Sequence, residues 1–431
     1  MRLAKPGGHA VLFILVTILI DTIGFGIIIP VWPKLMVEIT HLSLGEAARY
    51  GGYLGLLFAS MQFIFSPIIG NLSDQLGRRS VLLFSLAGLG IDFIIMGLAP
   101  NFTWLVIGRS ISGMFSATFP TASAYIADIT PPEKRAASFG YIGGVFGLGF
   151  IIGPGLGGII ADLAAHPPEV LGATIGHVLQ LAGTRAPFFA AACLSLLNVL
   201  YGIFVLPESL PPERRRPFKF LRANPLGALL HIRKYPAVAW MSVAVFFFYV
   251  AHNVNPAIWT YYVLEKFQWT STQMGLGLMA TGFAISLVSG LLTGPAVKLL
   301  GETRAIYLGL AGATLGFLMY AFATKGWMIF VAIPVGAIMG IAGPAIRGIM
   351  SENVPANEQG ELQGALGMLM SLTFIFTPVL YTQTFALFTI DPRVPHFPGA
   401  PFILAALATI VSGFIVKIAI HTPREIKKVA L

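Results

Sequence analysis

Long apolar runs recur along this chain, each close to the roughly 20 residues that a helix needs to cross a bilayer. Only 10% of the 431 residues are charged and 56% are hydrophobic, whereas about a quarter of a soluble domain is charged. A soluble fold is therefore excluded, and we expect an all-α membrane protein with twelve transmembrane helices. Gly, Pro and charged residues delimit the predicted spans as 11–32, 51–71, 81–99, 102–126, 136–162, 186–206, 237–260, 273–294, 303–323, 326–350, 361–388 and 399–420.

The polar segment 207–236 breaks this pattern and splits the twelve spans into six and six. We expect an N-terminal six-helix bundle at 1–206, a cytoplasmic central loop at 207–236 and a C-terminal six-helix bundle at 237–431. A shift of 224 residues also aligns Gly and Pro residues of the two halves: Gly51 with Gly275, Gly70 with Gly294, Gly77 with Gly301, Pro120 with Pro344, Pro131 with Pro355, Gly140 with Gly364 and Pro154 with Pro378. Two parallel repeats related by a pseudo-two-fold axis are an architecture that transporters use.

The distribution of basic residues predicts the orientation. Of the 27 Lys and Arg residues, 18 fall in segments that share a side with the N-terminus, six fall on the other side and three lie within spans. Because cytoplasmic loops carry the excess of Lys and Arg, both termini are predicted to be cytoplasmic. The basic residues behind the net charge of +9 are thus expected at the cytoplasmic membrane surface, and this charge does not indicate a nucleic-acid partner.

The loop GNLSDQLGRR, residues 70–79, follows the second span. Gly70 and Gly77 are expected to let the backbone turn where a side chain would clash. Asp74, Arg78 and Arg79 are expected at the membrane surface, where ions stay hydrated.

Three charged residues lie inside spans of the first half. Asp21 is about mid-bilayer, and Asp92 and Arg109 share a depth of about 10 Å below the outer surface, given a rise of 1.5 Å per residue. An ion pair between the last two is geometrically possible. Charges at such depth are costly and usually mark a cavity or an ion path, and a pair that only fixes helix packing is the alternative. The second half does not repeat these charges: at the shift of 224 residues, Asp92 aligns with Gly316 and Arg109 with Ile333. No predicted span of the second half contains a carboxylate in its interior.

Two further spans carry distinctive residues. In the fifth, Gly149, Gly153 and Gly157 are one helical turn apart, which indicates a small-residue packing stripe, and Pro154 adds a kink. In the seventh, His252, Asn253 and Asn255 precede Pro256, which breaks the helix and frees backbone carbonyls. Those three polar residues either line a cavity or form hydrogen bonds between helices.

The motif G-x-x-x-D-x-x-G-R-R at Gly70 to Arg79 resembles the loop between helices 2 and 3 of major facilitator superfamily (MFS) transporters, and departs from it at Gln75. The stretch Gly149-x-x-x-Gly153-Pro154-x-x-Gly157-Gly158 resembles the antiporter motif of MFS exporters. Leu105-x-x-x-Arg109-x-x-x-Gly113 resembles the MFS helix-4 motif that is associated with proton coupling. The whole chain is similar to the drug:proton antiporter branch, specifically to tetracycline pumps.

The resemblance implies roles for these residues. Asp21, Asp92 and Arg109 would carry proton coupling, and Gln62 would line the transport pathway with Asp92. Asp74 would control conformational switching beside the N-terminus of helix 11, near Gly360. Arg79 would reach Asp128 at the inner end of helix 4.

We therefore expect a proton-coupled antiporter that exports small amphipathic molecules by alternating access. A proton-coupled symporter or facilitator for a small metabolite is the alternative, and the helix-5 motif counts against it. A receptor or an intramembrane enzyme is disfavoured, because no paired catalytic carboxylates, Ser/His/Asp set or metal-spaced His cluster shares a depth. Without a GxxxxGK[ST] signature, we expect an ion gradient as the driving force, no cofactor and no metal. The protein is expected to be a monomer in the bacterial inner membrane.

The expected substrate differs from that of the tetracycline pumps. Those pumps carry a His in helix 8 and an Asp in helix 9, where this chain has Ile285 and Ala313. A cavity without that Asp provides little electrostatic stabilisation to offset the cost of removing a divalent-metal complex from water. His252 could stand in for the His, and the substrate is predicted to be more apolar or metal-free.

Overall fold

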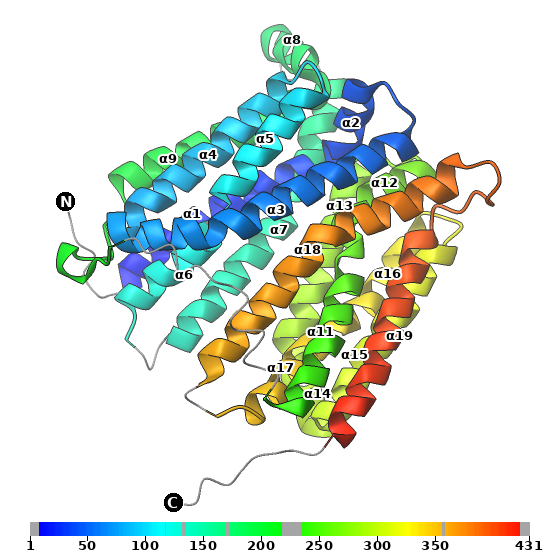
Figure 1. Cartoon of the computed structure of the whole chain (residues 1–431). Helices are drawn as coiled ribbons and strands as arrows, with labels where there is room; N and C mark the ends of the chain where they lie inside the picture. The colour runs from blue at the N-terminus through cyan, green and yellow to red at the C-terminus, as the bar shows by residue number, and fades with distance from the viewer. Residues whose placement is uncertain are drawn as a thin grey trace, which may run out of the picture. The chain divides into compact units, whose positions relative to one another are not determined.

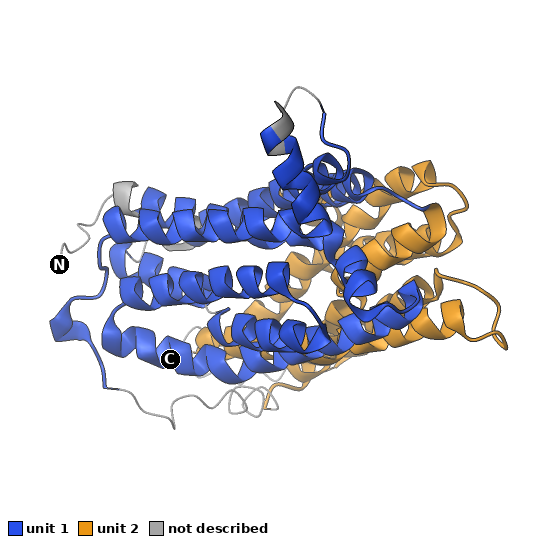
Figure 2. Cartoon of the chain, turned by 90° about the horizontal axis from the view of Figure 1, so that it is seen from above, with its two compact units in different colours: residues 1–223, 268–282 blue, residues 224–267, 283–431 orange. Residues whose placement is uncertain are grey.

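The computed structural model describes residues 8–116, 118–131, 135–168, 172–217, 234–355 and 358–422. The predicted cytoplasmic ends, 1–7 and 423–431, and most of the predicted central loop, 218–233, lie outside these ranges. The described chain is almost entirely helical (Figure 1). It divides into two compact units, residues 1–223 with 268–282 and residues 224–267 with 283–431 (Figure 2).

Unit 1 contains the helices of the first half. Their bounds are α1 (Gly8–Ile28), η1 (Ile29–Val31), α2 (Trp32–Thr40), α3 (Leu44–Leu76), α4 (Arg78–Leu98), α5 (Phe102–Phe115), α6 (Thr118–Ile129), α7 (Arg135–Ala165), α8 (Gly172–Ala182), η4 (Gly183–Arg185), α9 (Ala186–Phe204) and η5 (Pro212–Arg214). The first part of α13 (Ser271–Leu287), up to Gly282, also belongs to it.

Unit 2 contains the helices of the second half. Their bounds are α11 (Pro236–His252), α12 (Val254–Phe267), the rest of α13, the π-helical turn η7 (Val288–Leu292), α14 (Thr293–Leu300), α15 (Glu302–Phe322), α16 (Trp327–Ala337), η8 (Ile338–Ile341), α17 (Ala342–Glu352), α18 (Gln359–Ile390) and α19 (Ala400–His421).

Eleven continuous helical stretches of the described chain are long and apolar enough to cross a membrane. The predicted span 102–126 is not among them, because its helix stops at Phe115 and resumes at Thr118 as the shorter α5 and α6. Counted together as one span, α5 and α6 bring the described chain to the predicted twelve, and the prediction of an all-α membrane protein is confirmed. The 11-residue α8 was not predicted, because it is too short to register as a span.

Three spans of the second half contain interruptions. The seventh changes from α11 to α12 at Asn253, three residues before Pro256. A break near this position is expected because proline has no backbone N–H to continue the helical hydrogen bonds. The eighth contains the π-helical turn Val288–Leu292 and the tenth contains the 3-10 turn Ile338–Ile341. Such turns inside long helices frequently mark functional positions.

The sequence repeat reappears as the same local structure in each unit. In unit 1, α1 packs on α7 and α4 packs on α9, and in unit 2, α11 and α12 pack on α18 and α15 packs on α19. Gly77 (φ +103°) alone separates α3 from α4, and Gly301 (φ +77°) alone separates α14 from α15. Glycine adopts this region of φ readily, so both aligned glycines make the same turn.

Candidate functional site

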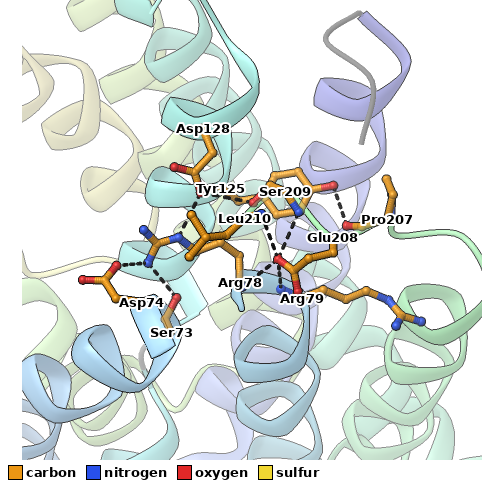
Figure 3. A network of polar contacts seen from close by, with 10 residues as sticks. All are labelled: Ser73, Asp74, Arg78, Arg79, Tyr125, Asp128, Pro207, Glu208, Ser209 and Leu210. Atoms are coloured by element: carbon orange, nitrogen blue, oxygen red, sulfur yellow. Dashed lines mark hydrogen bonds and ion pairs between the residues drawn. The ribbon is translucent and has the colours of Figure 1, made fainter. Parts of the chain in front are cut away.

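A network of polar contacts surrounds the junction between α3 and α4 (Figure 3). Asp74 and Arg78 are four residues apart, and the Arg78 Nη1 atom lies 2.6 Å from Asp74 Oδ1. Arg78 also donates from Nε to Asp128 Oδ2 in α6 at 3.0 Å and from Nη1 to Ser73 Oγ at 2.9 Å. One guanidinium thus joins the end of α3, the start of α4 and the end of α6.

Two predictions about this junction are wrong. Arg79 does not reach Asp128; its guanidinium donates to the backbone carbonyls of Gly202 and Ile203 in α9, and the neighbouring Arg78 takes the predicted contact. Adjacent helical residues point about 100° apart, so only one of them can face α6. Gly70 does not turn the backbone either, because it lies inside α3 with no atom within 4 Å of the position a Cβ would take.

Glu208 belongs to the same network and was missed by the sequence analysis. Its side chain is fully buried, and Oε1 accepts from the backbone N–H groups of Arg78 at 2.8 Å and Arg79 at 3.4 Å. These are among the N–H groups that a helix leaves unsatisfied at its start, where a negative charge is favourable. The segment after α9 therefore caps α4.

That segment is fixed on its other side by α6. Tyr125 donates to the Pro207 carbonyl at 2.9 Å, and Ser209 donates to Asp128 Oδ2 at 3.2 Å. A side chain at Gly77 would collide with the Glu208 carboxylate. Gly77 is thus required both for its positive φ and for this close approach. The sequence signal for Glu208 was an acid directly after the sixth span.

The predicted ion pair between Asp92 and Arg109 is present. Asp92 in α4 is fully buried, Arg109 in α5 is 7% exposed, and Arg109 Nη2 donates to Asp92 Oδ2. The guanidinium carbon lies 5.4 Å from the ring centre of Trp32 and 5.7 Å from that of Phe58. The pair is therefore enclosed by aromatic faces from α2 and α3, which favour a cation.

Each partner keeps an unsatisfied polar atom. Neither Asp92 Oδ1 nor Arg109 Nε has a hydrogen-bond partner. A Cβ on Gly108 would lie 2.7 Å from Asp92 Oδ1, so this glycine provides the space for the carboxylate. Leaving buried polar atoms unpaired costs free energy, which makes the site sensitive to a change of charge.

Asp21 lies in α1, a different helix from those that carry this pair. Its neighbour is the buried Thr118 hydroxyl of α6, and among the residues that the structure describes it has no ion-pair partner. Asp21 is half-buried, and it costs free energy to remove a charged carboxylate from water without a cation beside it. It is a candidate for binding and releasing a proton.

The glycines of α7 pack directly against α1, beginning one residue after Asp21. A Cβ on Gly149 would lie 2.7 Å from Thr22 Cβ, and one on Gly153 would lie 2.7 Å from the Ile23 carbonyl oxygen and 2.8 Å from Gly26 Cα. Gly157 contacts the Ile27 carbonyl in the same way. The predicted packing stripe is confirmed, and its partner is the helix that carries Asp21.

The remaining members of the motif face α13. A Cβ on Gly158 would lie 2.8 Å from Thr272 Cα, and Gly275 approaches the carbonyl of Pro154 closely enough that a side chain would collide. The helix α7, with Pro154 inside it, is thus in backbone contact with α1 on one side and with the first part of α13 on another.

The predicted cavity residues lie in different surroundings. Gln62 is partly buried in α3. His252 is exposed and stacks on Phe248 at 6.2 Å between ring centres. Asn253 is 1% exposed and donates to Thr373 Oγ1 of α18 at 3.3 Å, which supports a hydrogen bond between helices. Asn255 keeps a buried Oδ1 without a partner.

No cluster of three or more His, Cys, Asp and Glu side chains suited to a metal ion occurs within the described ranges. The side chains that the structure brings together at these sites are carboxylates and guanidinium groups, and the glycines of α7 pack against neighbouring backbone.

The sequence matches the family model of the Major Facilitator Superfamily over residues 14–378 and 241–430. It is 39% identical to the tetracycline resistance protein of class C from Escherichia coli, covering 88% of this chain and 90% of that protein. It is 37% identical to the class G protein from Vibrio anguillarum (85% and 88%) and 28% identical to multidrug resistance protein 1 from Bacillus subtilis (96% and 97%).

Solved structures of low sequence identity share the fold. The nucleoside transporter NupG superposes with a TM-score of 0.72 at 11% identity, covering 96% of this chain and 100% of that one. The human organic anion transporter MFSD10 superposes with a TM-score of 0.66 at 19% identity (95% and 99%). The chain therefore belongs to the Major Facilitator Superfamily of membrane transporters and is a relative of the tetracycline resistance proteins.

Proposed function

We propose that this protein is a proton-coupled exporter of small amphipathic molecules that works by alternating access in a bacterial inner membrane. Its relatives named for resistance to tetracycline and to multiple drugs cover most of the chain. They support drug efflux as the purpose of transport.

One observation carries the proposal. The antiporter-type stripe Gly149, Gly153 and Gly157 lies in backbone contact with α1 immediately after Asp21. A change in the charge or position of Asp21 is therefore transmitted to α7 through a contact that leaves no room for a side chain. Packed interfaces of this kind change between discrete arrangements instead of deforming continuously.

In this mechanism Asp21 binds the proton and the Asp92–Arg109 pair sets the charge of the transport path. Protonation of Asp21 removes the charge of a half-buried carboxylate, whereas protonation of Asp92 would release Arg109 from its partner. Either event changes which of two conformations is favoured, because a charge that is buried in one conformation and hydrated in the other contributes differently to each. Export then follows from proton entry.

The network around Arg78 is assigned to switching and not to substrate binding. Asp74, Arg78 and Asp128 join three helix ends by ion pairs, and Glu208 fixes the same place from the following segment. Gln62, His252 and Asn255 are assigned to the substrate path. Asn253 is assigned to helix packing, since it already has a partner in α18.

The proposal is tested with everted membrane vesicles from a host stripped of its own pumps. An imposed proton gradient should drive accumulation of a fluorescent amphipathic drug, and collapse of the gradient should abolish it. Asp21→Asn should lose the gradient-driven component, whereas Asp391→Asn, in an exposed pair with Arg393, should keep it. Accumulation driven by the opposite gradient would instead identify a symporter, and accumulation without any gradient a facilitator.

A further inference from the structure

A groove lies between α15 and α19, near the start of α15 and the end of α19. Its volume is about 540 Å³. Its lining comes from these two helices and includes Thr303, Tyr307, Ile410, Phe414, Lys417 and His421. Both helices belong to unit 2, so the groove is formed within one unit.

The lining changes from apolar to polar along α19. Ile410, Phe414, Lys417 and His421 follow one another at intervals of three or four residues, so they share one face of the helix. Ile410 and Phe414 are exposed apolar side chains, and Phe414 is 66% exposed. With a rise of 1.5 Å per residue, His421 lies about 16 Å along the helix from Ile410. The groove therefore has an apolar part within the span and a polar part at the end of the helix.

Gly413 also lines the groove and leaves space between the two helices. A Cβ on this glycine would lie 3.7 Å from Leu310 Cδ1 and 4.0 Å from Tyr307 Cε1, both in α15. These are ordinary contact distances between apolar atoms. A side chain at this position would therefore occupy the groove without colliding with the packing of α15 on α19.

The polar end of the groove carries a positive charge. Lys417 is exposed, and its ammonium group has no ion-pair partner within the described ranges. His421 Nδ1 lies 2.8 Å from the Lys417 carbonyl, which can only accept, so Nδ1 donates and Nε2 is left for a ligand. Of the described residues that line the groove, none is acidic. The neighbouring Glu302 lies instead against Gly348 of α17, where a Cβ would be 2.6 Å from its Oε1.

We propose that this groove binds one anionic phospholipid of the cytoplasmic leaflet, with its phosphate at Lys417 and an acyl chain along Phe414 and Ile410. Basic pockets between transmembrane helices on the cytoplasmic side suit anionic headgroups. Tyr307 adds an amphipathic ring of the kind that lies at the level of the headgroups. The inference is independent of the exported compound and of proton coupling, and it uses the expected cytoplasmic location of the C-terminus to choose the leaflet.

Native mass spectrometry of the purified protein in mild detergent measures the affinity for the first phosphatidylglycerol molecule added. Lys417→Gln should weaken this affinity about five-fold, the equivalent of one basic residue at an anionic membrane surface. Lys417→Arg keeps the charge and should bind as the parent does. Gly413→Leu fills the groove without changing its charge and should weaken binding at least as much as Lys417→Gln. Phosphatidylcholine, which has no net charge, should bind the parent more weakly than phosphatidylglycerol.

The matched control is Lys298→Gln, which removes an exposed basic residue near the end of α14, on the same predicted side of the membrane. It should bind phosphatidylglycerol as the parent does. Unchanged affinity in both Lys417→Gln and Gly413→Leu would overturn the proposal, as would an equal loss in Lys298→Gln or equally tight binding of phosphatidylcholine. A dimer that excludes the lipid would assign the groove to a second copy of the chain and would also overturn it. Lys417→Gln decides the test if Gly413→Leu fails to fold.

Discussion

The buried ion pair Asp92–Arg109 links α4 to α5. Its two charges are removed from water and held by aromatic rings, a neighbouring glycine and each other. Removing one partner leaves the other charge buried without compensation, which costs more than the attraction that is lost. The pair should therefore behave as a unit in mutagenesis.

We predict that Asp92→Asn destabilises the purified protein by about 3–5 kcal/mol, as expected for breaking a buried pair. Arg109→Gln should do the same, and the double variant should be less destabilised than either single variant. Thermal unfolding in detergent measures this cycle. A double variant that is plainly less stable than both single variants would show that the two residues are not partners.

Glu208 gives the second prediction at this scale. Glu208→Ala removes the acceptor at the start of α4 and should cost about 1 kcal/mol, the usual value of a helix cap. Transport turnover should fall as well, because the cap holds the Arg78 network in place. Glu208→Gln, which keeps an acceptor oxygen, should have a smaller effect. Glu213→Ala, an exposed acid of the same segment, serves as the control and should change neither quantity.

The charged residues also show what the sequence could provide. Depth along the predicted spans was enough to pair Asp92 with Arg109. It could not decide between Arg78 and Arg79, because that choice depends on α4 beginning directly after Gly77. The i, i+4 spacing of Asp74 and Arg78 was a usable signal for the correct one. Glu208 could be noticed only as an acid just after the sixth span, and its contact with the start of α4 could not be predicted because the two are 130 residues apart in sequence.

At the scale of elements, α7 is the part of the molecule where a small change should have the largest effect. Gly153→Ala would place a methyl group against the backbone of α1. Overpacking of this kind costs about 1–3 kcal/mol, so we predict a loss of vesicle transport with the protein still present in the membrane. The measurement is initial rate per amount of protein.

The matched control is Gly144→Ala on the same helix, where no atom lies within 4 Å of the new methyl group. Since alanine favours a helix over glycine by about 1 kcal/mol, this variant should be as stable as the parent or more so and should transport normally. Equal loss of transport in both variants would mean that helix flexibility, and not contact with α1, explains the role of the stripe.

The helices were predictable where the length of an apolar run defines them, and less so where a helix breaks or changes to a 3-10 or π-helical turn. The twelve spans follow from runs of about 20 residues. The break between α5 and α6 falls at Ser116, four residues before Pro120, and the π-helical turn Val288–Leu292 contains Leu291, four residues before Pro295. A proline marks where a helix can be interrupted, but the form of the interruption depends on packing against other helices, which the sequence does not display.

At the scale of the whole molecule, the chain resembles relatives named for tetracycline resistance, but its second half differs from the pattern expected of tetracycline pumps at two positions. Ile285 and Ala313 occupy the positions of the expected His and Asp, and Ala313 is fully buried. We predict weak or no tetracycline resistance in a pump-deficient host, together with export of more apolar or metal-free compounds. A drug-accumulation profile measures both, and strong magnesium-dependent tetracycline efflux would contradict the prediction.

The most direct test of proton-coupled export is proton movement caused by substrate. The protein is reconstituted with a pH-sensitive dye inside the vesicles, and a compound found in the accumulation profile is added. The parent protein should move protons on addition, Asp391→Asn should do the same, and Asp21→Asn should bind the compound without moving protons. Unchanged proton movement in Asp21→Asn would contradict the assignment of coupling to the α1 carboxylate.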